Sequence, residues 1–123
     1  MRILKDIFYL FFPKVCVTCY KTLLQSEELV CTLCRHDLPL ICYPNYQENK
    51  IAAIFYGRIP IEKASAFLYF NKEGKVQQLI HQLKYKGNQK IGTFIGKWMG
   101  EVLKETNQFN DIDYIIPVPL HPK

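Results

Sequence analysis

Two closely spaced pairs of cysteines near the N-terminus constrain the fold of this chain more than any other feature. The four residues are Cys16, Cys19, Cys31 and Cys34. They read C-x2-C, an 11-residue loop and C-x2-C, which is close to the zinc-ribbon pattern although the loop is slightly short. Two such pairs can place four sulfur atoms in a tetrahedron around one zinc ion, with Zn–S distances near ~2.3 Å. A metal would also explain how residues 1–45 fold, since they are too few to be stable on a hydrophobic core alone.

Disulfides, redox chemistry and free structural thiols are the alternatives for these cysteines. The apolar run at residues 7–12 is too short to span a bilayer and no signal-peptide cleavage site follows it, so we expect a cytoplasmic protein without a transmembrane segment. In a reducing cytosol, paired thiols serve as metal ligands more often than as disulfides. We interpret Cys42 as a buried or half-exposed free thiol. His36, which follows the second pair, is a weaker candidate ligand in place of a cysteine.

Metal binding would change the charge of the chain and offset local strain. The formal charge is +5 at pH 7, and four thiolates with one Zn²⁺ would lower it to about +3. Lys14, Lys21 and Arg35 lie beside the cysteines in sequence and can balance the negative site. Zinc knuckles often place glycine after the second cysteine of a pair, where the chain turns left-handed, but this chain has Tyr20 and Arg35 there. The cost, on the order of 1–2 kcal/mol, is small beside the roughly 10–16 kcal/mol of zinc binding.

Apolar residues at helical spacing predict a helix over residues 2–12. We expect this helix to dock on the rest of the protein. Binding to a membrane surface is the alternative, which the lack of a strongly basic face disfavours. The same spacing predicts helices over residues 76–83 and 91–103, with Gly87 as the stop signal between them.

The remaining apolar segments predict strands. Residues 51–56 and 64–70 follow a polar linker at residues 43–50, and the turn residues between them favour a hairpin. Residues 113–119 are almost continuously apolar, which is typical of a strand buried on both faces of a parallel sheet. Such a sheet needs further strands, yet the sequence ends at Lys123. We therefore interpret the chain as the N-terminal fragment of a longer protein.

Four stretches of the sequence together resemble the ComF family of competence proteins. They are LFFP at residues 10–13, the turn at 70–74, LIHQLKYKG at 79–87 and IIPVPLHP at 115–122. The resemblance covers nearly the whole chain. It is specific because the cysteine pairs, LKYKG and PVPLHP occur in this order.

The resemblance implies an α/β fold with two parts. These are a four-cysteine, zinc-ribbon-like module in residues 1–45 and an incomplete type I phosphoribosyltransferase-like domain in residues 46–123. It also implies a role in DNA uptake during natural transformation, with single-stranded DNA and a helicase-like competence protein as partners. The full-length form would bind phosphoribosyl pyrophosphate. The loop that holds this ligand does not occur in the sequence, so we expect no catalysis by this chain alone. The alternatives are a phosphoribosyltransferase of nucleotide metabolism and a zinc-ribbon module that binds nucleic acid.

The resemblance also suggests ligand-binding residues outside the cysteines. His121 and Lys123 follow the last predicted strand and would face the pyrophosphate, although a rigid strand exit is the simpler interpretation of this proline-rich segment. Independently of the resemblance, Lys84, Tyr85 and Lys86 would contact a phosphate or nucleic acid, because basic and aromatic residues alternate there. They lie in a region, residues 72–104, that has seven lysines and two glutamates. The simpler interpretation is a solvated face whose cations complement the helix dipole.

Overall fold

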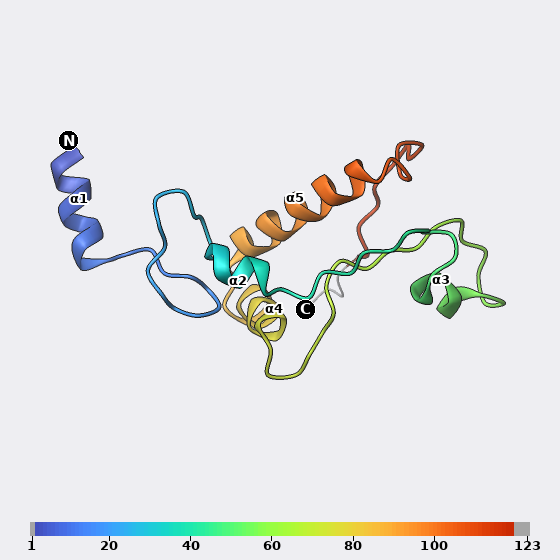
Figure 1. The fold of residues 1–123 in the computed structure, drawn as a ribbon, viewed down its shortest axis with the longest axis horizontal. Coiled ribbons are helices and arrows are strands. Elements are labelled where there is room, and N and C mark those ends of the chain that lie inside the picture. The colour runs from blue at the N-terminus through green and yellow to red at the C-terminus, as the bar shows by residue number, and fades with distance from the viewer. Residues whose placement is uncertain (1, 120–123) are drawn as a thin grey trace.

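A computed structural model describes residues 2–119, and its regular secondary structure in that range is helical (Figure 1). Its helices are α1 (Arg2–Phe11), α2 (Thr32–His36), α3 (Lys50–Phe55), α4 (Lys75–Tyr85) and α5 (Gln89–Glu105). Among the described residues, β pairing is limited to two isolated antiparallel bridges, Val15 with Thr22 and Leu40 with Leu68. The α/β fold expected from the sequence is therefore not supported.

Helix α1 confirms the predicted N-terminal helix but not its docking. It lies at one end of the elongated molecule, away from the other helices (Figure 1). Every described side chain from residue 3 to residue 15 is exposed, and Leu4 and Leu10 are 73% and 77% exposed. The expectation that this helix packs on the rest of the protein is wrong in this structure, because no described segment covers its apolar side.

Helix α3 replaces the first predicted strand. The Asn49 side-chain Oδ1 accepts hydrogen bonds from the backbone N–H groups of Ile51 and Ala52, at 2.9 and 3.0 Å, and so caps the helix. Gly57, with φ of 72°, follows the helix. The predicted strand at residues 51–56 is therefore wrong, as is the hairpin built on it.

The second predicted strand, residues 64–70, is extended but pairs elsewhere. It runs beside residues 39–41, where the Ile41 N–H donates to the Phe67 carbonyl oxygen at 2.9 Å. The contact with residues 39–41 amounts to one isolated bridge, so the segment belongs to no sheet among the described residues.

Helices α4 and α5 confirm the two predicted helices and form a hairpin through Gly87, whose φ is 64°. Val76 and Leu79 of α4 and Ile91 of α5 are buried in the same core as the cysteines. The Gln82 side-chain amide also donates to the Val17 carbonyl oxygen at 2.7 Å. The shared core consists of Cys16, Val17, Val30, Cys31, Cys34, Leu38, Val76, Leu79 and Ile91. The division at residues 45 and 46 stays a prediction.

A smaller cluster joins the segment before α3 to residues 108–111. Tyr46, which is 2% exposed, meets the Phe109 ring edge-on with centroids 4.9 Å apart. The Lys63 ammonium lies 3.0 Å from the Asp111 carboxylate next to it. The segment predicted as a polar linker, residues 43–50, thus carries a buried aromatic anchor.

The last predicted strand, residues 113–119, forms no β pairing in the structure. Its apolar side chains are open to solvent, with Ile115 92% and Ile116 85% exposed. No described strand lies beside it to accept its backbone hydrogen bonds, so this prediction is wrong for the described residues. His121 and Lys123 lie outside the described residues.

Candidate metal centre

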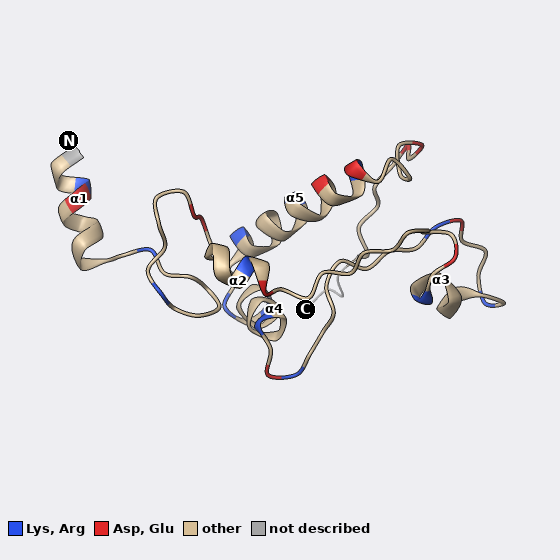
Figure 2. Ribbon diagram, viewed as in Figure 1, with Lys and Arg blue, Asp and Glu red and all other residues tan. Residues whose placement is uncertain are grey.

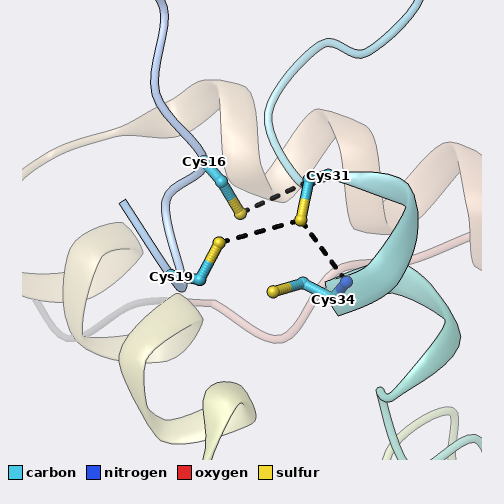
Figure 3. A group of neighbouring side chains, drawn as sticks. All are labelled: Cys16, Cys19, Cys31 and Cys34. Atoms are coloured by element: carbon cyan, nitrogen blue, oxygen red, sulfur yellow. Dashed lines mark hydrogen bonds between the residues drawn. The ribbon is translucent and has the colours of Figure 1, made fainter. Parts of the chain in front are cut away.

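The four cysteines of the two pairs converge on one point, as Figure 3 shows. Their Sγ atoms all lie within 4.8 Å of one another, and the Cys19 and Cys31 sulfurs are 3.7 Å apart. A tetrahedron with Zn–S distances of ~2.3 Å has edges of about 3.8 Å, so this separation fits a shared ion. It is far longer than a disulfide bond of about 2.05 Å. All five cysteines of the chain are free.

A left-handed turn shapes the first pair. The Tyr20 N–H donates to the Cys16 carbonyl oxygen at 2.9 Å, and the Cys16 N–H donates to the Lys21 carbonyl oxygen at 2.8 Å. Tyr20 has a φ of 61°, so the left-handed conformation predicted after Cys19 is confirmed.

The second pair is built differently, on the N-terminus of α2. Cys31 is the N-cap residue, and its Sγ accepts a hydrogen bond from the Cys34 N–H at 3.5 Å. Arg35 therefore lies inside a right-handed helix, and the left-handed turn expected there is wrong.

Hydrogen bonds around the sulfur atoms favour ionisation of Cys16. The Cys31 N–H donates to the Cys16 Sγ at 3.3 Å, and the Thr18 hydroxyl lies 3.1 Å from the same sulfur. Burial alone raises the pKa of Cys16, but these hydrogen bonds lower it to about 6. At Cys31 the Cys34 N–H lowers the pKa, but burial and hydrogen bonds with the neighbouring thiols raise it to about 12. A divalent cation would let all four thiols ionise together, since it screens thiolates from one another.

Lys75, at the start of α4, is a cation near the cysteines that sequence reasoning missed. Its Nζ lies 2.7 Å from the Asp37 carboxylate, which raises the pKa of Lys75, and Cys34 raises it further. The same contact lowers the pKa of Asp37. No motif or spacing connects Lys75 with the cysteines, so only the packing of α4 against α2 could reveal it.

Two further residues near the cysteine pairs in sequence, His36 and Cys42, are not part of the cysteine cluster. Among the described residues, the group that could hold a metal ion consists of the four cysteines and does not include His36, which is exposed. Cys42 is exposed, so the expectation that it is buried or half-exposed is wrong. The donor set is therefore four sulfur atoms, three of them buried.

A groove of about 1040 Å³ lies between the cysteine module and α5. The Arg35 guanidinium lies over the Trp98 ring at 4.5 Å and the Phe94 ring at 5.8 Å, inside this groove. Figure 2 shows basic residues near the junction of α2 and α5. The charged residues that line the groove are Lys14, Glu28, Arg35, Lys90, Lys97 and Glu101.

The structure places the predicted nucleic-acid residues Lys84, Tyr85 and Lys86 elsewhere, at the end of α4. All three are exposed, and Tyr85 packs edge-on against His81 with ring centroids 5.0 Å apart. Lys86 lines a second, smaller pocket of about 400 Å³ beside Tyr20. None of the three lines the larger groove.

The two cysteine pairs give opposite expectations for a glycine substitution after the second cysteine. Tyr20→Gly relieves a left-handed conformation that side chains disfavour, so we expect it to stabilise the metal-loaded chain by up to about 1 kcal/mol. Arg35→Gly places glycine in a helix and should destabilise it by about 1 kcal/mol. Urea denaturation measures both. Equal signs for the two variants would contradict the assignment of one turn and one helix.

Among the described residues, no helix combines the length and apolar character needed to cross a membrane. Neither a protein-family model, nor a curated protein, nor a solved structure matches this chain. The resemblance to ComF proteins therefore stays a prediction from the sequence motifs. The conclusion that the geometry itself carries is a cluster of four cysteines, compatible with a structural metal site.

Proposed function

We propose that this chain is a ComF-like DNA-handling protein in which a structural zinc ion holds together part of a surface for single-stranded DNA. The observation that carries this proposal is the groove between the cysteine module and α5, where cationic and aromatic side chains converge. The ComF resemblance supplies the DNA-uptake context, the cytoplasmic location and the helicase-like partner. Phosphoribosyl pyrophosphate binding through His121 and Lys123 would belong to the full-length form.

Zinc is the metal that best suits this donor set. Thiolates are soft ligands, and a tetrahedral set of four sulfurs selects zinc or an iron–sulfur centre. Four protein ligands leave no open position on the ion, so the site would be structural rather than catalytic. Cys31 and Cys34 would connect the ion to α2, and α2 carries Arg35 into the groove.

The groove offers the two features that sequence-tolerant binding of single strands requires. Lys14, Arg35, Lys90 and Lys97 outnumber the two glutamates, so the lining has net positive charge for a phosphate backbone. Trp98 is an aromatic side chain of the groove, and a base would stack on its ring by displacing the Arg35 guanidinium that lies over it. Lys84, Tyr85 and Lys86 would extend the contact along the α4–α5 hairpin.

Binding of a fluorescent oligothymidine to the zinc-loaded chain at several salt concentrations tests this proposal. We expect the affinity to fall as the salt concentration rises, because lysine and arginine side chains that contact phosphates release counterions from the DNA. The double variant Lys90→Gln with Lys97→Gln should weaken binding and reduce the salt slope by about 1.4, or about 0.7 for each lost contact.

Lys50→Gln is the matched control, since Lys50 is an exposed lysine on α3, outside the groove. It should leave the salt slope unchanged. The groove is excluded as the DNA site if the double variant binds like the unmodified chain. A loss seen only with Lys84→Gln and Lys86→Gln would move the site to the end of α4.

A further inference from the structure

The sequence of α1 separates into two faces. At 100° per residue, the apolar side chains share one broad side of the helix, and Lys5, Asp6 and Tyr9 lie together on the opposite side. The apolar side consists of Ile3, Leu4, Ile7, Phe8, Leu10 and Phe11. A helix with this pattern needs an apolar environment on one side and water on the other.

No described residue supplies that apolar environment. Phe8 is 60% exposed and Phe11 is 73% exposed, and α1 stands clear of the α2, α4 and α5 cluster (Figure 1). Moving a phenylalanine side chain out of water favours association by about tenfold or more. Several such residues on one exposed helix therefore represent a large unused driving force for association.

α1 itself has no strongly basic face, and the cations that indicate which surface it fits include one from the segment that follows the helix. The Lys14 ammonium lies 5.6 Å from the centre of the Tyr9 ring, which brings a second positive charge to the side of the helix that carries Lys5. Lys21 adds a third in the following loop, and Asp6 is the one acidic residue in residues 3–21. Cations bordering an apolar face, with aromatic side chains on the helix, match the anionic headgroups and acyl chains of a lipid surface.

We propose that α1 lies in the surface of an anionic lipid bilayer, with Phe8 and its apolar neighbours among the acyl chains and Lys5 and Lys14 at the headgroups. The helix has 10 residues, which is too short to cross a bilayer of about 30 Å but sufficient to lie in its interface. The proposal is independent of the metal, and it shares only Lys14 with the DNA groove.

Cosedimentation of the full, zinc-loaded chain with vesicles tests the proposal. We expect binding to vesicles of phosphatidylcholine with phosphatidylglycerol, and weaker binding to phosphatidylcholine alone. Phe8→Glu should reduce the partition coefficient at least about tenfold, because it removes an inserted ring and adds a negative charge. Lys5→Gln should reduce binding to the anionic vesicles by about fivefold.

Phe70→Glu is the matched control, since Phe70 is 55% exposed and lies outside α1. It should bind vesicles like the unmodified chain, and all variants should keep their zinc because α1 is not part of the shared core. Equal binding to both kinds of vesicle, or an unaltered partition of Phe8→Glu, overturns the proposal. Self-association without vesicles that Phe8→Glu abolishes also overturns it, because a second copy would then cover this face.

Discussion

Cys31→Ser is expected to reduce the zinc content from about one ion per chain to nearly none and to unfold residues 13–40. Zinc binding contributes roughly 10–16 kcal/mol to the folding of comparable modules, so losing one of four thiolates removes most of what stabilises this part. Serine keeps the backbone N–H that donates to the Cys16 sulfur and can itself cap α2, so the expected loss is due to the missing thiolate. Metal analysis of the purified chain and limited proteolysis within residues 13–40 measure the effect.

Cys42→Ser provides a matched control for this substitution. It removes one thiol from the same chain, but Cys42 is exposed and lies outside the cluster of four cysteines. We expect it to keep about one zinc ion and the unmodified digestion pattern. The metal-centre hypothesis fails if Cys31→Ser and Cys42→Ser carry equal amounts of metal and are digested alike.

Ile91→Ala is expected to destabilise the metal-loaded chain by about 2–5 kcal/mol, the range for truncating a large aliphatic side chain in a core. Ile91 is 2% exposed, and its cluster includes Cys16, Cys31 and Cys34. The cavity should therefore loosen the cysteine module as well as the α4–α5 hairpin. Urea denaturation gives the change in free energy of unfolding, and transfer of zinc to a chromogenic chelator gives the rate of metal loss.

The control for this variant is Ile115→Ala, because Ile115 is 92% exposed. It should change the free energy of unfolding by no more than about 0.5 kcal/mol. If Ile91→Ala unfolds the hairpin but leaves the rate of zinc loss unchanged, the cysteine module is stable independently of α5. If Ile91→Ala both lowers the free energy of unfolding and speeds the loss of zinc, the two parts share a single cooperative core.

Sequence reasoning succeeded where a signal repeats over a short distance. The apolar periods of residues 76–83 and 91–103 predicted α4 and α5, because every third or fourth side chain must face the same side of a helix. The C-x2-C spacing likewise predicted that four sulfur atoms would meet. Tyr20 was correctly expected to be left-handed, whereas the same expectation failed for Arg35, which lies in α2.

The predictions that were wrong concern segments whose structure depends on the residues that surround them in space. The apolar run at residues 51–56 is short enough to suit a strand or a helix, and the Asn49 cap selected the helix. Residues 113–119 have the composition of a buried strand, but no described segment pairs with them. For α1 the period was right, yet a period says only that one side is apolar and not what covers it.

The sequence by itself thus determined the helices of clear period and the four thiols that cluster together, because both are encoded by residues a few positions apart. Only the tertiary structure decided that Lys75 lies near Cys34 and that Arg35 meets Trp98 in a groove. These contacts depend on how α2, α4 and α5 pack around the shared core. Packing depends on the shapes of many side chains at once, so a local sequence pattern cannot predict it.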